Sequence, residues 1–427
     1  MTEDNMSKKR GIYIHMPFCV KKCRYCAFLS FDADGSPRKE YTDALEKEIK
    51  LRAASERENE TNKLIDTVYI GGGTPSIMDI ASLSEMVKTL RREFDIDKDA
   101  EFTLEANPAT LGRKDGVTLA KLQAYKFMGV NRLSMGVQSM DNDRLHYLGR
   151  IHTPENVARD MKLIRQKGFA NVNLDLMFSV PGETTADAMS DLEKILEFEP
   201  EHVSCYSLQI EEGTPFGEMA ENGELSEVPD EEDRETYHRI CRRLEEAGYE
   251  HYEISNFAKK DPDNMDDISP YRSRHNSLYW NMDEYIGIGL GASGFINGVR
   301  YKNTSDIDEY FTALGEGRLP VAEEHVNTAF DNISEAVFTG LRRREGISYE
   351  KAVQAYWRTS IGDIDMRNDE GSEEKNSVAE RFWDIFAEAR AEAEEYAVRG
   401  SLIIDNDGIK LTEQGIDISN SIMSLFV

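Results

Sequence analysis

Three cysteines lie close together near the start of the chain, at Cys19, Cys23 and Cys26. Three thiolates on one loop can hold three corners of an iron–sulfur cubane and leave the fourth iron open to a ligand from outside the protein. A structural zinc site normally has four protein ligands, and His15 is the nearby residue that could supply the fourth. No nearby cysteine completes such a set, because Phe28 occupies the position two residues after Cys26. The spacing therefore favours a [4Fe–4S] cluster over zinc.

A glycine-rich segment, GGGTP, occupies residues 71–75. Glycine has no Cβ atom, so the backbone can approach a ligand closely and present its N–H and C=O groups. A tight turn between a strand and a helix also uses glycine, so the segment alone is a weak signal. Its predicted position at the same edge of the fold as the cysteines favours a ligand-binding loop.

Strand-like runs recur along the first half of the chain with room for a helix between them. They occupy residues 11–18, 67–73, 101–107, 132–139, 171–179 and 202–209. Apolar residues at helical spacing occupy residues 41–51, 83–94, 118–127, 154–166 and 186–198. Strands that alternate with helices form a parallel sheet, so this α/β pattern predicts a partial (β/α)6 barrel of TIM type. Such barrels build their sites at the C-terminal ends of the strands, where the cysteines and glycines lie.

Polar and apolar residues alternate along three of these strands, whereas strands buried on both faces are usually continuously apolar. The polar positions are Glu101, Thr103, Glu105, Asn107, Arg132, Ser134, Gly136, Gln138, Asn171, Asn173 and Asp175. If helices cover the apolar positions, the polar ones face the barrel lumen, where unpaired polar groups are costly without a polar ligand. The pattern predicts a hollow, occupied barrel. An antiparallel sheet with one face in water is the alternative, which the helical spacers disfavour.

The rest of the chain divides into two further parts. Residues 211–233 are acidic, an amphipathic helix is predicted around 234–247, and residues 259–272 form a polar loop. From about residue 328 helices return, followed by a hairpin around residues 406–408 and a final helix, while residues 366–374 are a charged, loose insertion. We predict a barrel over residues 1–215, an extension over 216–325 and a small winged-helix-like domain over 326–427.

The composition excludes several classes of protein. The 427 residues carry a formal net charge of −29, which disfavours binding to nucleic acid. No apolar run of about 18 or more residues is present to span a membrane, and the first ten residues lack the apolar stretch of a secretory signal. We therefore expect a cytoplasmic protein with reduced thiols, in which Cys205 and Cys241 are buried apolar residues.

Several motifs carry a resemblance to a known family. The CxxxCxxC and GGGTP motifs, with a glutamate on the third strand, resemble the radical SAM superfamily. The segments YIHMPFCVKKCRYC, YIGGGTPS, LEANPATL, RLSMGVQS, LGRIHT, LDLMFSVPGET, HNSLYW and LTEQG occur in this order. Together they resemble the oxygen-independent coproporphyrinogen III oxidases and their heme-chaperone relatives called HemW.

The resemblance implies roles for individual residues. It implies that Cys19, Cys23 and Cys26 hold a [4Fe–4S] cluster. The residues implied to contact S-adenosylmethionine are Tyr13, Tyr25, Gly72, Gly73, Thr74, Glu105, Gln138, Arg150 and Asp175. The lumen positions of Glu105, Gln138 and Asp175 agree with this, since a sulfonium and an amino group need carboxylate partners. The carboxylate of the ligand needs a guanidinium such as that of Arg150.

Three functions fit the resemblance, and the sequence favours the heme chaperone. The oxidases resemble CxxxCxxCxC with a further cysteine where this chain has Phe28, and they carry a longer segment before the cluster. HNSLYW resembles the HNxxYW signature of the chaperones, in which the histidine, here His275, is a proposed heme ligand. The implied partners are heme and heme-accepting apoproteins. The alternatives are a coproporphyrinogen III oxidase, which decarboxylates propionates by a radical route, and an enzyme that opens or alkylates the heme ring.

The sequence offers several candidate heme ligands. Neutral imidazole is a common axial ligand, and Tyr279 and Trp280 offer apolar faces to a porphyrin. Many relatives have a cysteine where this chain has Ser273 and a histidine where it has Ser293. A second axial ligand at either position is therefore missing. The alternatives left open are His15, His146, His152, His202 and His251.

Overall fold

The computed structural model describes residues 10–58, 63–261, 263, 268–357 and 377–427. The predicted insertion at residues 366–374 lies outside these ranges. Among the described residues, no helix combines the length and the apolar character needed to cross a membrane.

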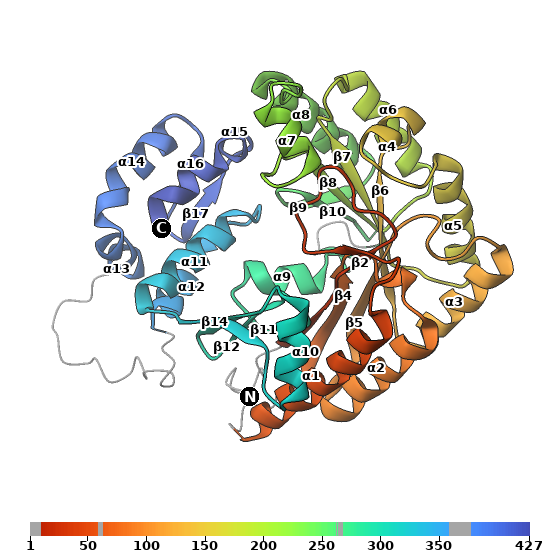
Figure 1. The fold of residues 1–427 in the computed structure, drawn as a ribbon. Helices are drawn as coiled ribbons and strands as arrows, with labels where there is room; N and C mark the ends of the chain where they lie inside the picture. Colours follow the sequence, from red (N-terminus) through yellow and green to blue (C-terminus); the bar gives the residue numbers. More distant parts are fainter. Residues whose placement is uncertain (1–9, 59–62, 262, 264–267, 358–376) are drawn as a thin grey trace.

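The predicted parallel strands form the centre of one large sheet (Figure 1). They are β1 (Arg10–Met16), β4 (Ile65–Gly72), β5 (Ile96–Ala106), β6 (Arg132–Gln138), β7 (Val172–Phe178) and β8 (His202–Ser207). Neighbours in this series pair in parallel, in chain order. The predicted partial (β/α) barrel is confirmed.

Helices cover the outer face of this sheet (Figure 1). They are α1 (Arg38–Glu58), α2 (Ile80–Glu93), α3 (Asp115–Met128), α5 (Pro154–Gln166) and α6 (Thr185–Leu196), with the short α4 (Asn142–Tyr147) between β6 and α5. The apolar phase of the strands packs under them, as Leu104, Leu133 and Leu174 are fully buried in the main core. The opposite, polar phase is therefore left to face the lumen.

The sheet continues on both sides of the predicted strands. On one side β11 (Glu284–Ile288) pairs in parallel with β1, and β12 (Ser293–Ile296), β13 (Val299–Asn303) and β14 (Val321–Val326) follow antiparallel. On the other side β10 (Asn256–Lys259) and β9 (Tyr249–Glu253) add an antiparallel pair to β8. The helices of this region are α7 (Pro215–Glu221), α8 (Asp230–Glu246), α9 (Arg274–Trp280) and α10 (Ile307–Gly315). The first cysteine lies in a separate two-stranded ribbon of β2 (Phe18–Cys19) and β3 (Phe31–Asp32).

The C-terminal part is mostly helical, with a small sheet. Its helices are α11 (Ala329–Leu341), α12 (Tyr349–Tyr356), α13 (Val378–Ile385), α14 (Ala387–Val398), α15 (Glu413–Asp417) and α16 (Ser419–Met423). The predicted hairpin is present as β16 (Leu402–Ile404) and β17 (Gly408–Leu411), joined by β15 (Ile347–Ser348). The boundaries at residues 215/216 and 325/326 stay a prediction.

Residues 342–344 join this C-terminal part to the edge of the main sheet. Ile254 donates its N–H to the carbonyl of Arg342 at 3.1 Å, and Arg344 donates to the carbonyl of Tyr252 at 3.1 Å. An antiparallel bridge pairs Glu253 with Arg343. The segment therefore pairs with β9, the last strand of the large sheet.

Candidate functional site

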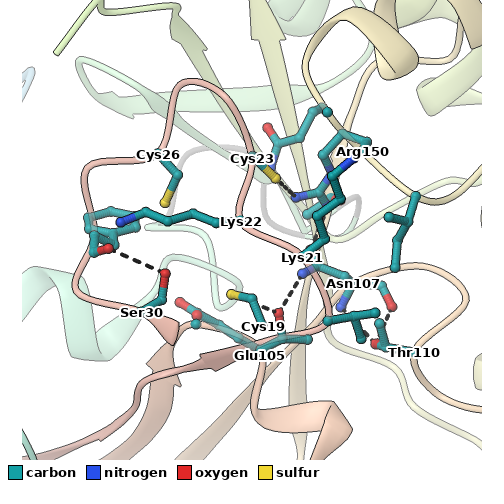
Figure 2. A pocket seen from close by; sticks show the side chains of 18 of the residues that line it. Cys19, Lys21, Lys22, Cys23, Cys26, Ser30, Glu105, Asn107, Thr110 and Arg150 are labelled. Carbon is teal, nitrogen blue, oxygen red and sulfur yellow. Dashed lines mark hydrogen bonds between the residues drawn. The ribbon is translucent and has the colours of Figure 1, made fainter. Parts of the chain in front are cut away.

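The C-terminal ends of the parallel strands form a rim with a cavity of about 150 Å³. Figure 2 shows the three clustered cysteines on the walls of this pocket, with Arg150 beside Cys23. Of the residues predicted to bind the cluster or S-adenosylmethionine, those lining the cavity are Cys19, Cys23, Tyr25, Cys26, Gly72, Gly73, Thr74, Glu105, Gln138, Arg150 and Asp175. Residues at the ends of β1, β4, β5, β6 and β7, or in the loops that follow these strands, thus meet in one place.

The clustered cysteines are free thiols in a partly buried setting. Burial raises the pKa of Cys19 and of Cys26, so a bound metal is needed to hold these thiols as thiolates near neutral pH. Thr74 donates its hydroxyl to the sulfur of Cys19 at 3.6 Å, and Arg150 donates to the sulfur of Cys23 at 3.5 Å. Both donors face a sulfur that would carry negative charge.

The arrangement of the sulfurs fits a cluster better than a single ion. Across the described ranges, no three histidine, cysteine or carboxylate side chains converge on the position of one metal ion. A cubane places each thiolate on a different iron, so its ligands stand apart around the cluster. His15, the alternative fourth zinc ligand, has both ring nitrogens occupied, by the Tyr13 hydroxyl at 2.9 Å and the Leu29 carbonyl at 2.9 Å. The donor set present fits a three-cysteine cluster.

The glycine segment is fixed against the base of the cysteine loop. Gly73 donates its N–H to the carbonyl of Met16 at 2.8 Å, and Thr74 donates to that of Phe18 at 2.8 Å. Gly72 has a φ of +107°, and a Cβ atom there would lie 2.4 Å from the ring of His15. Only glycine satisfies this backbone and this contact together.

Arg150 and Glu105 are each held in place by neighbours. Arg150 reaches Cys23, the side-chain oxygen of Asn107 at 2.5 Å and the carbonyl of Gly136. Glu105 accepts hydrogen bonds from the Tyr69 hydroxyl at 2.6 Å and the Gly72 N–H at 2.9 Å. Burial raises the pKa of Glu105 to about 7. A guanidinium and a carboxyl group on one cavity can grip the two charged ends of an amino acid.

Gln138 and Asp175 complete the polar wall of the cavity. Gln138 adopts a φ of +69°, which is rare outside glycine and typical of a constrained functional position. Its side-chain oxygen accepts a hydrogen bond from Tyr206 at 2.8 Å. Asp175 accepts one from Asn173 at 2.6 Å, and burial raises its pKa.

A larger cavity of about 490 Å³ continues into the lumen. It shares Tyr25, Cys26, Phe28, Glu105, Ser134, Asp175 and Tyr206 with the first cavity. Deeper lining residues include Tyr69, Arg132, Asn173, Ser204, Asn256 and Asn276. The polar lumen predicted from the alternation is present.

His275 lies behind this cavity instead of lining it. Its side chain is 1% exposed, and both ring nitrogens are bonded, Nδ1 to the Thr67 hydroxyl at 2.7 Å and Nε2 to the Tyr279 hydroxyl at 2.8 Å. Burial lowers its pKa to about 3, so the imidazole is neutral. Its ring stacks on that of Tyr69 at 5.1 Å, and Tyr69 does line the cavity.

Tyr13 differs from the other predicted contacts of S-adenosylmethionine, because it is not among the lining residues of either cavity. Its hydroxyl is bonded to His15, and its ring lies beside those of Tyr69 and His275, with centroid distances of 6.2 and 6.5 Å. Among the alternative histidines, His202 is bonded to Asn173 at 2.6 Å and Tyr252 at 2.7 Å.

Sequence reasoning missed Tyr69, Tyr206 and Asn276 as lining residues. Tyr206 alternates with His202 and Ser204 along its strand, so the same period-two pattern could have identified it. Tyr69 lies between the apolar Val68 and Ile70 in the same kind of alternation, whereas Asn276 had no comparable local signal.

Comparisons with known proteins agree with this geometry. The family model described as "Radical SAM superfamily" matches residues 13–195. The heme chaperone HemW of Bacillus subtilis is 34% identical over 83% of this chain and 88% of that protein. HemW of Escherichia coli is 36% identical over 66% of this chain and 69% of that protein. The solved structure of coproporphyrinogen III oxidase (HemN) from Escherichia coli has a TM-score of 0.78 at 22% identity, covering 98% of this chain and 90% of that one, and so shares the fold.

Proposed function

Because this chain belongs to the heme chaperone HemW family of radical SAM proteins, we propose that it binds heme and passes it to acceptor apoproteins. The observation that carries the proposal is a similarity to these chaperones that extends well beyond the cysteine loop. The cytoplasm suits this function, since a reducing compartment keeps the three cysteines free of disulfide bonds.

The radical SAM family implies a [4Fe–4S] cluster and S-adenosylmethionine. We assign the cluster to Cys19, Cys23 and Cys26, and the cluster would supply an iron with an open position for S-adenosylmethionine. We further propose that Arg150 holds the carboxylate of that ligand and that Glu105 accepts a hydrogen bond from its amino group. The remaining proposed contacts are Tyr25, Gly72, Gly73, Thr74, Gln138 and Asp175, with Tyr13 one layer behind them.

For heme we propose the larger lumen cavity, with His275 as a ligand behind its wall. The neutral imidazole is the form that binds iron. Its Nε2 atom can reach a metal only after the hydroxyl of Tyr279 has left it. This cost is that of one hydrogen bond, about 1 kcal/mol.

The shared fold leaves coproporphyrinogen III oxidase as the competing function. Phe28 favours the chaperone, because it is 69% exposed at the mouth of both cavities, in the place of a further cysteine. An apolar ring there suits contact with a porphyrin face.

The deciding experiment compares two substrates with the same preparation. Protein reconstituted anaerobically with iron and sulfide is mixed with heme, and in parallel with coproporphyrinogen III plus S-adenosylmethionine and a reductant. We expect a stable heme spectrum and no protoporphyrinogen IX. Turnover of the porphyrinogen without a stable heme complex would reject the chaperone function.

A further inference from the structure

Arg132 is a buried guanidinium on the wall of the lumen cavity. It begins β6, pairs in register with Thr103 of β5, and is 2% exposed. It lies on the same polar phase as Ser134, and both residues line the cavity of about 490 Å³. Its charge is therefore directed into the barrel and away from the helices.

Arg132 lacks the direct ion pair that other buried arginines have. Throughout the described part of the chain, no hydrogen bond or ion pair reaches its side chain, and its Nε atom is buried without an acceptor. By contrast, Arg10 is paired with Glu56 and Glu284, and Arg52 with Glu48. Structural arginines in this fold are thus neutralised inside the protein.

Burial raises the pKa of Glu105 and of Asp175, and the charge of Arg132 acts to lower both, but neither carboxyl group makes a direct ion pair with it in the described residues. Glu105 accepts from Tyr69 and Gly72, and Asp175 accepts from Asn173. Other polar atoms around the lumen are also unpaired, since Thr103 Oγ1 and Asn256 Oδ1 are buried without a partner in the described residues. A buried guanidinium without a direct partner is destabilising, so a ligand anion that pairs with Arg132 would be favoured at this site.

The lining of the cavity indicates what kind of molecule carries this anion. Ser134, Asn173 and Asn276 line this cavity with hydroxyl and amide groups, and Phe28 and Leu208 line it with apolar side chains. A ligand with an apolar body and an acidic edge satisfies both. The planar guanidinium fork matches a carboxylate in a bidentate pair.

We propose that Arg132 binds a carboxylate of the ligand in the lumen cavity, and that this carboxylate is a propionate of heme. The inference rests on the proposed heme-binding function and adds the group that orients heme. The carboxylate of S-adenosylmethionine has the same chemistry and is the competing source.

The test compares heme with heme dimethyl ester, in which both propionates are capped. The full-length, cluster-reconstituted protein is titrated with each ligand, as wild type, as Arg132→Met and as Arg239→Met, a control on the exposed part of α8 that is 49% exposed. We expect the wild type and the control to bind heme about tenfold or more tightly than the ester, because a buried charge pair is lost with the ester. Arg132→Met should bind both ligands equally.

The outcomes separate this inference from the proposed function. Equal binding of heme and ester by the wild type overturns the role of Arg132 while leaving heme binding intact. This comparison does not depend on whether a variant folds. Failure of the wild type to bind either ligand overturns both. If Arg132→Met keeps the preference for heme but binds S-adenosylmethionine about tenfold more weakly, the anion is that of S-adenosylmethionine and the proposal is wrong.

Discussion

The Nε2 atom of His275 lies 2.8 Å from the hydroxyl oxygen of Tyr279, one turn further along the same helix. Both residues belong to the HNSLYW segment, so a tyrosine of the motif is hydrogen-bonded to the nitrogen through which His275 could bind iron. Tyr279 therefore controls whether His275 can act as a ligand.

Replacing Tyr279 should strengthen heme binding if His275 is the iron ligand. Tyr279→Phe removes the hydrogen bond and leaves Nε2 buried without a partner, which costs the heme-free protein about 1–3 kcal/mol. We expect roughly a fivefold or greater gain in heme affinity, measured by titration of the Soret band, because about 1 kcal/mol corresponds to this factor. His275→Ala should weaken heme binding and shift the band. If neither variant changes the spectrum or the affinity, His275 does not bind the iron.

Each clustered cysteine should be needed for the cluster. Cys19→Ala, Cys23→Ala and Cys26→Ala each remove one corner ligand, so iron and acid-labile sulfide should fall to background after anaerobic reconstitution. Cys205→Ala is the matched control, since Cys205 is 1% exposed in the core and away from the cavity. Undiminished iron and sulfide in the three variants would remove the basis of the cluster assignment.

Arg150 should be needed for S-adenosylmethionine but not for folding. Arg150→Met leaves the carboxylate of the ligand without its buried partner, and the expected loss in affinity is about tenfold to a thousandfold. Equilibrium dialysis with the reconstituted protein measures this loss. Arg159→Met is the control, because Arg159 lies on the outer helix α5 and pairs with Asp115 at 2.7 Å. Equal affinities of the two variants would show that Arg150 does not hold this ligand.

The raised pKa of Glu105 should make the cluster-free protein less stable as pH rises. Burial raises this pKa from 4.5 to about 7 in the folded state, so the folded chain holds a proton that the unfolded chain has already released. The contribution of Glu105 to stability is complete below pH 4.5 and is lost as pH rises toward 7.

Glu105→Gln removes this contribution to the pH dependence. We expect the wild type to lose more thermal stability than the variant between about pH 5 and pH 8. Comparing the change in Tm of the two proteins cancels the effect of other titrating groups. Parallel changes would mean that Glu105 has an ordinary pKa in the folded protein.

The barrel could be predicted because each of its strands and helices is indicated by residues within that element. Each parallel strand is bounded by turn residues, and the period-two alternation identified the lumen face of β5, β6 and β7. The residues lining the rim cavity follow from this, since parallel strands end at one edge. The agreement at Glu105, Gln138 and Asp175 depends on that geometry.

What the sequence left open depends on contacts between distant segments. Strand β11 pairs with β1 after more than half the chain has intervened, and nothing within Glu284–Ile288 specifies that partner. The positions of Tyr13 and His275 depend on such pairings, because both pack around Tyr69. Sequence spacing could name these residues but could not show that they lie behind the cavity wall.

The pairing of residues 342–344 with β9 has a consequence for how the protein can be shortened. An outermost strand with free N–H and C=O groups is a template for joining another chain. Deleting the residues after the barrel would uncover that template at Tyr252 and Ile254. We therefore expect a form that lacks these residues to self-associate through this edge.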